Sequence, residues 1–192
     1  MQQDNLLVKL YHSPKTIFTM KDIALLWTEN DYNNLRAKVA YYAKNGDLMR
    51  LRNGIYAKDK NYNVRELATS LVVPSYISFE TVLRDSGVIF QHYESVFAAG
   101  LRSREITCDG RNFIYRQLRK EIFYNPMGIA NNQDIATASK ERAFLDTIYL
   151  SPKFYFDNLR SMNWEMCFEL VKIYKNQELA KRLKQYQKHD AQ

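Results

Sequence analysis

The residues of this chain best suited to bind a charged partner lie between positions 31 and 65. Eight Lys and Arg residues stand there against three Asp, so the stretch carries +5 of the chain's net charge of +7. A side-chain amide pairs with adenine and a guanidinium with guanine in the major groove of DNA, and basic side chains also bind phosphates. The candidates for such contacts are Asn33, Asn34, Arg36, Lys38, Arg50, Arg52 and Asn53. A polyanionic partner is therefore expected, and the alternative is an ordinary solvated polar surface.

Two predicted helices position the first four of these candidates. Thr19 followed by Asp22 resembles a capping box and opens a helix over residues 20–27. Asp31 is a good N-cap for a second helix over roughly 32–45, which Gly46 should end. The first helix is expected to bury Ile23, Leu26 and Trp27, and the second to bury Leu35, Val39 and Tyr42. The candidate side chains then lie on the open face of the second helix.

A β-hairpin is predicted directly after these helices. The pair Asn53-Gly54 between apolar-alternating arms is typical of a type I′ turn, which needs positive φ at both positions. Arg50 and Arg52 flank its tip. Helix, turn, helix and hairpin in this order form a winged helix-turn-helix, which presents one helix and one β-turn to DNA. The hairpin residues would then enter a minor groove or hold phosphates.

The rest of the chain predicts a second domain of mixed type. Residues 59–65 are polar and read as a linker, which divides the chain into domains 1–60 and 65–192. A helix over 79–85 capped by Ser78 is followed by strand-like segments up to residue 136, one of them over 121–125, with a hairpin at Asp109-Gly110. Further helices are expected over 139–150, 154–161, 163–175 and 176–188. The predicted fold class is α+β and mainly helical, with a winged helix-turn-helix followed by a mixed α/β C-terminal domain.

A second set of basic side chains lies in the strand-rich part of this domain. At alternating strand positions some of them would share a face, so a ligand or partner surface is conceivable there. Its members are Arg102, Arg104, Arg111, Arg116 and Arg119. The basic tail from Lys172 onward is either a surface that contacts DNA or an acidic partner, or only a solvated helix face.

Catalytic chemistry is poorly represented. The histidines stand in unrelated contexts, and no phosphate-cradling glycine loop or paired-cysteine metal motif occurs. Of the clustered carboxylates Asp134, Glu141 and Asp146, the last is better suited to accept buried hydrogen bonds or to lie on a helix surface than to act as a general base. We expect no enzymatic activity, cofactor or metal. Cys108 and Cys167 are expected to be buried free thiols, which suits the cytoplasm, and no segment approaches ~18 apolar residues.

Three segments resemble the AbiEi-type antitoxins of type IV (abortive-infection) toxin–antitoxin pairs. They are the winged helix ending in RLRNGIYAK, the segment VVPSYISFETVLRDSGVI, and IATASKERAFLDTIYL. The third departs slightly from the family pattern at residues 139–146. The resemblance implies a DNA-binding N-terminal domain, repression of the protein's own operon through double-stranded operator DNA, and neutralisation of a nucleotidyltransferase-like toxin.

Two other functions remain open. One is a stand-alone transcriptional regulator whose second domain senses a ligand or dimerises. The other is an enzyme such as a nuclease that uses the winged helix only for targeting, which would need a carboxylate cluster that the sequence does not display.

Overall fold

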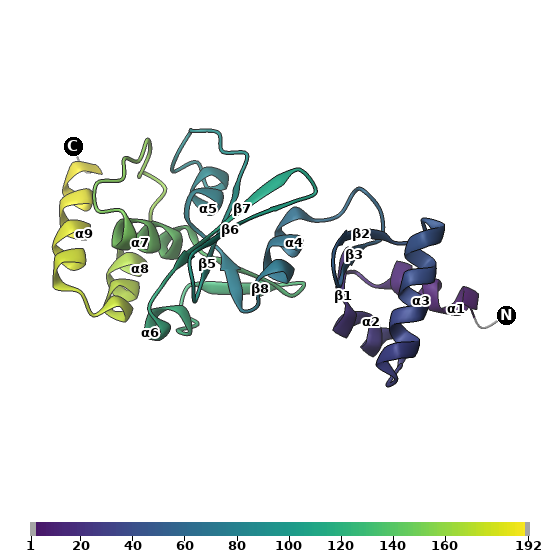
Figure 1. Ribbon diagram of the computed structural model, residues 1–192. Helices are drawn as coiled ribbons and strands as arrows, with labels where there is room; N and C mark the ends of the chain where they lie inside the picture. Colours follow the sequence, from purple (N-terminus) through teal and green to yellow (C-terminus); the bar gives the residue numbers. More distant parts are fainter. Residues whose placement is uncertain (1–2, 191–192) are drawn as a thin grey trace. The chain divides into compact units, whose positions relative to one another are not determined.

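A computed structural model describes residues 3–190 of the chain (Figure 1). The chain divides into two compact units, Met1–Leu71 and Val72–Gln192. Each unit contains helices and a sheet of its own, so the fold is of mixed α/β type, and helix exceeds strand at 45% against 21% of residues.

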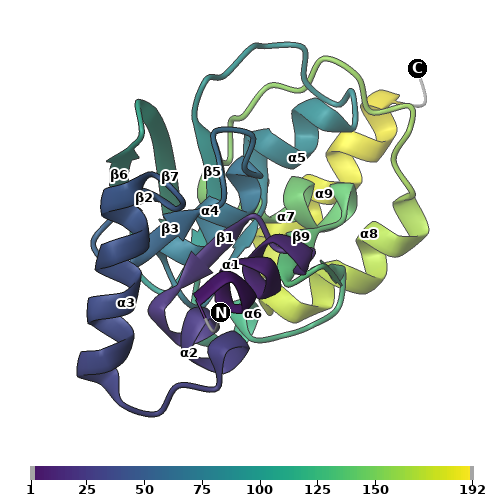
Figure 2. The same cartoon turned by 90° about the vertical axis from the view of Figure 1, so that its right-hand side faces the viewer.

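The first unit surrounds a small antiparallel sheet whose strand order is β1-β3-β2. Its helices α1, α2 and α3 appear together with these strands in Figure 2. They bury one core between them, to which Phe18, Trp27, Leu35 and Val39 contribute. The elements are α1 (Gln3–His12), β1 (Ile17–Thr19), α2 (Met20–Trp27), α3 (Tyr32–Asn45), β2 (Met49–Arg52), β3 (Ile55–Ala57) and α4 (Val64–Leu71).

Both helix starts predicted in this unit are confirmed. Thr19 and Asp22 form a reciprocal capping box at α2, and the side chain of Asp31 accepts hydrogen bonds from two backbone N–H groups at the start of α3. Gly46 ends α3 with φ +85°, a conformation that glycine adopts without strain. The predicted core residues of α3 are buried. In α2, Ile23 and Trp27 are buried, but Leu26 is only partly so, which corrects that prediction.

The hairpin exists, but its predicted turn type is wrong. Gly54 has φ +77°, whereas Asn53 does not have a positive φ, and the β2–β3 register shifts between Arg50 and Arg52. The carbonyl of Gly54 accepts a hydrogen bond from the N–H of Met20 at 3.1 Å, which satisfies a free donor of the first turn of α2. This tertiary contact accompanies a bulged hairpin in place of the regular type I′ form.

The division between the units falls later than the sequence predicted. Thr16 donates to the carboxylate of Glu66 through its N–H at 2.9 Å and its hydroxyl at 2.6 Å, and Asn63 donates to the Thr16 hydroxyl at 2.8 Å. Tyr62 is buried. The predicted linker 59–65 is therefore part of the first unit, held there at Tyr62 and Asn63, and α4 belongs to that unit.

The second unit is built on a mixed six-stranded sheet of order β6-β7-β5-β4-β9-β8. The pairs β4·β9 and β5·β7 are parallel, and the other neighbours are antiparallel. The elements are β4 (Ser75–Ile77), α5 (Phe79–Asp85), β5 (Val96–Gly100), β6 (Arg104–Cys108), β7 (Arg111–Gln117), α6 (Lys120–Phe123), β8 (Ile129–Asn132), β9 (Ile135–Ala138), α7 (Lys140–Leu150), α8 (Trp164–Leu170), the 3₁₀ helix η1 (Val171–Tyr174) and α9 (Gln177–Asp190). Figure 1 shows α7, α8 and α9 gathered beyond one end of this sheet.

Predictions for the second unit are confirmed in part. Asp109 and Gly110 both have positive φ in the β6–β7 hairpin, as a type I′ turn requires. The predicted strand over 121–125 is wrong, because residues 120–123 form the short helix α6. The predicted helix over 163–175 is α8 continued by the 3₁₀ turn η1.

The helix predicted over 154–161 is also wrong, because this segment makes long-range hydrogen bonds in place of helical ones. The N–H groups of Asp157 and Asn158 both donate to the carbonyl of Val88 at 3.1 Å. The carboxylate of Asp157 in turn accepts from the N–H of Phe90 at 2.8 Å. The segment is therefore irregular and tied to the loop after α5.

Candidate nucleic-acid interface

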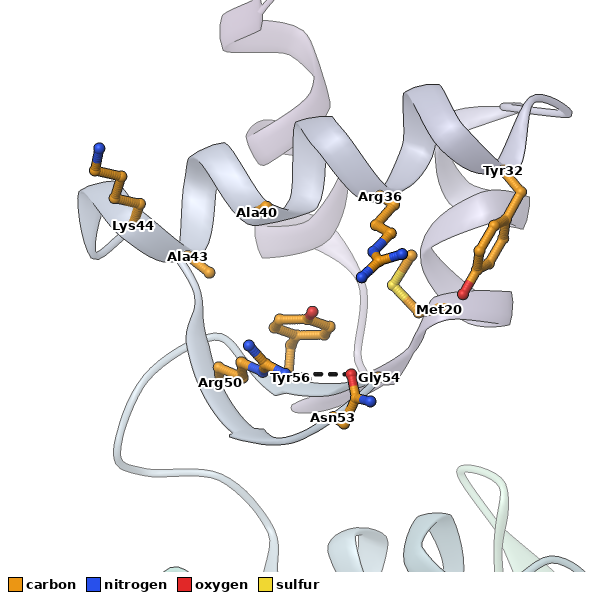
Figure 3. Close-up of a pocket in the computed structure, with 10 residues that line it drawn as sticks. All are labelled: Met20, Tyr32, Arg36, Ala40, Ala43, Lys44, Arg50, Asn53, Gly54 and Tyr56. Atoms are coloured by element: carbon orange, nitrogen blue, oxygen red, sulfur yellow. Dashed lines mark hydrogen bonds between the residues drawn. The ribbon is translucent and has the colours of Figure 1, made fainter.

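A groove of about 560 Å³ runs between α3 and the β2–β3 hairpin in the first unit (Figure 3). The described residues that line it combine three cations with polar and small side chains, and none of them is a carboxylate. The lining residues are Met20, Tyr32, Arg36, Ala40, Ala43, Lys44, Arg50, Asn53, Gly54 and Tyr56. We call this feature the α3–hairpin groove.

One face of α3 forms one wall of the groove. Tyr32, Arg36, Ala40 and Lys44 recur every four residues, so they share a face of the helix. The adjoining face is buried in the core, which fixes how the helix is rotated. Ala40 is small, and Figure 3 shows the guanidinium of Arg36 extending from α3 toward the hairpin.

The hairpin forms the other wall. Arg50 is exposed, and its Nη2 donates to Oδ1 of Asn53 at 3.2 Å, which restrains the guanidinium beside the turn. Tyr56 is 7% exposed, and its ring lies between the hairpin and α3 in Figure 3. The bond from Met20 to the carbonyl of Gly54 ties this wall to α2.

The positive charge of the groove is not neutralised from within. Among the residues that the structure describes, neither Arg36 nor Lys44 has an acidic side chain within ion-pair distance. Among the described residues, the guanidinium of Arg50 hydrogen-bonds to the neutral amide of Asn53 and forms no ion pair. The groove therefore offers donors to an anionic partner.

Two predicted contact residues, Asn34 and Lys38, lie outside the groove and bond to Glu29. Glu29 accepts from the amide of Asn34 at 2.7 Å and from the ammonium of Lys38 at 2.6 Å. The hydrogen bond from Lys38, with that from the N–H of Asp31, lowers the pKa of Glu29, so this carboxylate is ionised at neutral pH. Asn34 and Lys38 are thus bonded to a neighbouring carboxylate of the same unit.

The seven predicted contact residues are therefore distributed over three places. Arg36, Arg50 and Asn53 meet in the groove. Asn34 and Lys38 meet at Glu29, while Asn33 and Arg52 are exposed outside the groove.

The structure adds groove residues that the sequence analysis did not select. Tyr32 and Lys44 lie on the same face as Arg36, and the four-residue spacing of positions 32, 36, 40 and 44 was the available signal. Met20 and Tyr56 come from other elements, so no local pattern indicates them. Tyr41 lies at the edge of the core at 50% exposure, and Tyr42 is buried, as predicted.

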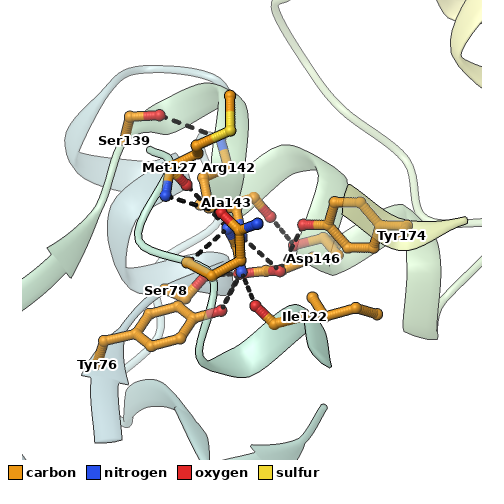
Figure 4. Close-up of polar contacts among 11 residues, drawn as sticks. Tyr76, Ser78, Ile122, Met127, Ser139, Arg142, Ala143, Asp146 and Tyr174 are labelled. Carbon is orange, nitrogen blue, oxygen red and sulfur yellow. Dashed lines mark hydrogen bonds and ion pairs between the residues drawn. The ribbon is translucent and has the colours of Figure 1, made fainter. Parts of the chain in front are cut away.

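The second unit contains a buried polar network centred on Asp146 and Arg142 (Figure 4). Asp146 is fully buried, and its two oxygens accept from four donors. These are Arg142 Nε at 3.3 Å, the Tyr174 hydroxyl at 2.6 Å, the Tyr76 hydroxyl at 3.0 Å and the Ser78 hydroxyl at 2.9 Å. Burial raises the pKa of Tyr76 and of Tyr174, and the charge of Asp146 raises each further. Both phenols therefore remain protonated donors.

Arg142 completes this network. Its guanidinium donates to the carbonyls of Ile122 at 2.6 Å, Met127 at 2.8 Å and Asn125 at 3.3 Å. The side chain is fully buried, so it holds α6 and the following turn against α7. Burial raises the pKa of Asp146, and the guanidinium and the hydroxyl donors oppose that rise. The expectation that Asp146 accepts buried hydrogen bonds is confirmed.

The second basic set does not form one surface. Arg116 pairs with the buried Glu80 at 2.6 Å, and its guanidinium carbon lies 5.0 Å and 4.9 Å from the ring centres of Phe79 and Phe97. Arg119 donates to the carbonyl of Tyr174 at 2.7 Å. The remaining members, Arg102, Arg104 and Arg111, are exposed.

The remaining candidate carboxylates and both cysteines lie in the second unit. Asp134 is exposed in the β8–β9 turn, whereas Glu141 is buried. Cys108 and Cys167 are buried, and neither forms a disulfide among the described residues, as predicted; burial raises the pKa of Cys167 to about 12. Within residues 3–190, no group of three or more His, Cys, Asp or Glu side chains is placed to hold a metal ion, and no helix is long and apolar enough to cross a membrane.

No family model matches this chain, and no curated protein matches it. What the protein does is therefore inferred from its residues and their geometry.

Proposed function

We propose that this protein binds double-stranded operator DNA through its first unit and represses transcription there. The element order α1-β1-α2-α3-β2-β3, with the sheet order β1-β3-β2, supports the assignment of this unit as a winged helix. In that arrangement α3 is the recognition helix and the β2–β3 hairpin is the wing.

The observation that carries this proposal is the uncompensated charge of the α3–hairpin groove. Three cations from a helix and a hairpin converge on one concave surface that includes no acidic residue. Pairing such cations with phosphates releases counterions from the nucleic acid, which favours binding at physiological salt.

The shape of α3 favours duplex DNA over other nucleic acids. Its 14 residues span about 21 Å, and its open face carries short side chains such as Asn33 and Ala37. A helix of this kind fits the major groove of B-form DNA, which is about 12 Å wide, but not the narrow major groove of an RNA helix. Single strands are usually bound by several exposed stacking aromatics, whereas Tyr41 packs edge-on against Tyr42.

The antitoxin part of the proposal rests on the resemblance to AbiEi-type antitoxins. We assign neutralisation of a nucleotidyltransferase-like toxin to the second unit, in the cytoplasm, without catalysis by this chain. The second candidate, a stand-alone regulator, shares the DNA-binding part and differs only in what the second unit does.

DNA binding is tested by fluorescence anisotropy with the full chain. The probes are a duplex from upstream of its own gene and a shuffled duplex of the same length and composition. We expect tighter binding to the upstream duplex and weaker binding to both as NaCl rises. A folded chain with no affinity for either duplex at low salt would remove the proposed function.

Neutralisation is tested by co-expression with the product of the adjacent gene. The full chain should restore growth, and an Arg36→Ala/Arg50→Ala variant should also do so if the second unit is responsible. Failure of both to restore growth beside an active toxin would favour the stand-alone regulator. Cleavage of plasmid DNA by the purified chain with Mn²⁺ would point instead to a nuclease.

A further inference from the structure

The open surface of α3 is divided into a concave side and a protruding side. The concave side is the α3–hairpin groove, with Arg36 and Lys44 on the helix and Arg50 opposite. The protruding side carries Asn33, Ala37 and Tyr41, which follow each other at four-residue spacing and are exposed outside the groove.

We propose that Arg36, Lys44 and Arg50 clamp the sugar–phosphate strand of duplex DNA in this groove, so that Arg36 anchors the backbone and Asn33 reads a base. This inference rests on the proposed binding of duplex DNA. It assigns the arginine of the recognition helix to phosphates and the specificity to the protruding side of α3.

Shape is the first reason. Base edges lie at the floor of the DNA grooves, so a protein reaches them with a surface that protrudes. The sugar–phosphate strand is a ridge, and a ridge fits a concave surface. The α3–hairpin groove is concave, and the guanidinium of Arg36 extends across it toward the hairpin (Figure 3).

The donor set is the second reason. Arg36 and Arg50 approach from opposite walls, and a guanidinium fork matches two phosphate oxygens. Arg50 is restrained by Asn53 at 3.2 Å, which lowers the conformational entropy that binding would cost. Tyr32, 62% exposed at the rim, adds a hydroxyl of the kind that binds phosphates.

The side of α3 that carries Asn34 and Lys38 is unsuited to base contacts, which leaves Asn33 as the residue to read a base. Asn34 and Lys38 are bonded to Glu29, whose negative charge repels phosphate. Asn33 is exposed, and its side-chain amide has no hydrogen-bond partner among the described residues, so it can pair with adenine N6 and N7; the methyl group of Ala37 suits the thymine methyl. The protruding side of α3 therefore favours a site with an A·T pair.

The test compares Arg36→Ala and Asn33→Ala in the full chain, using selection from a pool of randomised 20-base-pair duplexes and then salt titrations on one selected and one shuffled duplex. Arg36→Ala should select the same motif and lose affinity for both duplexes by the same factor. The slope of log K against log salt should become shallower by about 0.9, one phosphate contact. Arg36→Lys should keep the slope, because it keeps the charge.

Asn33→Ala should behave in the opposite way. It should lose about 5- to 150-fold of its preference for the selected duplex, with adenine no longer enriched at one position and the slope unchanged. Arg102→Ala, which removes the same charge from an exposed site in the second unit, is the matched control for net charge and should leave the slope unchanged.

The outcomes separate this inference from the proposed function. A changed motif in Arg36→Ala, or an unchanged affinity and slope, would overturn the phosphate clamp while DNA binding survives. An unchanged motif in Asn33→Ala would overturn its role as a reader. A wild-type chain that selects and binds no duplex would overturn the proposed function itself. Circular dichroism of each variant confirms that it is folded.

Discussion

Arginines in the two units have the same charge and opposite surroundings. In the α3–hairpin groove, Arg36 and Arg50 are exposed and face no carboxylate. In the second unit, Arg142 is fully buried, and its guanidinium donates to Asp146, to the Tyr76 hydroxyl and to three backbone carbonyls. A guanidinium with all its donors satisfied inside the protein has none left for a partner. The contrast separates cations whose donors are used within the fold from cations whose donors remain available to a partner, which a count of charges along the chain does not.

The largest effect is expected at Arg142. Arg142→Met should lower the unfolding free energy of the second unit by about 3–5 kcal/mol, because the buried carboxylate of Asp146 loses its cation. Urea denaturation followed by Trp164 fluorescence, in a Trp27→Phe background, reports on this unit alone. Trp27 lies in the first unit and Trp164 in the second.

Arg102→Met provides the matched control. Arg102 is exposed, so its replacement should change the same free energy by no more than about 0.5 kcal/mol. Equal effects of the two substitutions would show that the buried network does not stabilise the second unit.

A smaller effect is expected at the capping box of α2, which supports one side of the groove. Asp22 accepts from Thr19 at 2.8 Å and from Lys15 at 2.7 Å. Asp22→Asn should destabilise the first unit by about 1 kcal/mol, as loss of a helix cap does. Trp27 fluorescence in a Trp164→Phe background measures this change, and Lys21→Ala on the exposed side of the same helix should leave it unaltered.

The contribution of Asp22 should depend on pH. Burial alone would raise the pKa of Asp22, but the hydrogen bonds from Lys15 and Thr19 outweigh it and lower the pKa below 3.8. Because the folded value lies below the unfolded one, the stabilisation is complete above about pH 4 and is lost as the pH falls through the folded pKa. The wild type and Asp22→Asn should therefore converge in stability at low pH, and a constant difference would contradict this cause.

These sites show which features could be predicted from the sequence. The sequence predicts the caps Thr19 and Asp31 and the buried face of α3 correctly, because each depends only on residues within one or two helical turns. The α3–hairpin groove depends on how the hairpin folds back beside α3. Tyr56 and Met20 come from other elements than α3, so no local sequence pattern predicts that they line the groove. The bond between Met20 and Gly54, which accompanies the bulged turn, joins residues far apart in sequence.

In the second unit, the sequence-based predictions that were wrong also concern features that depend on distant parts of the chain. Arg142 and Asp146 are four residues apart on a helix, a spacing that usually predicts an exposed pair, and only the fold buries them. The segment 154–161 contains apolar residues at helical spacing, but its backbone bonds to Val88 across the unit. Residues 122–124, Ile-Phe-Tyr, form a short apolar run, for which helix and strand cannot be separated by periodicity.

The smallest effect is expected at an exposed pair in α9. Lys181 and Glu178 lie 2.8 Å apart, with side chains 69% and 70% exposed, so solvent and salt screen their attraction. Lys181→Ala should leave both the urea midpoint of the second unit and duplex affinity unchanged. A midpoint shift as large as that of Asp22→Asn in its own unit would mean that exposed charges matter more here than their surroundings suggest.

The most direct test of the proposal that the α3–hairpin groove binds DNA is the salt dependence of duplex binding. The full chain and its Arg36→Ala/Arg50→Ala variant are titrated with one shuffled 20-base-pair duplex at several NaCl concentrations. The variant should bind more weakly, and its slope of log K against log salt should be shallower by about 1.8, the value for two phosphate contacts. An identical slope in a folded variant, or a folded wild-type chain with no duplex affinity at low salt, would contradict the assignment of DNA binding to the α3–hairpin groove.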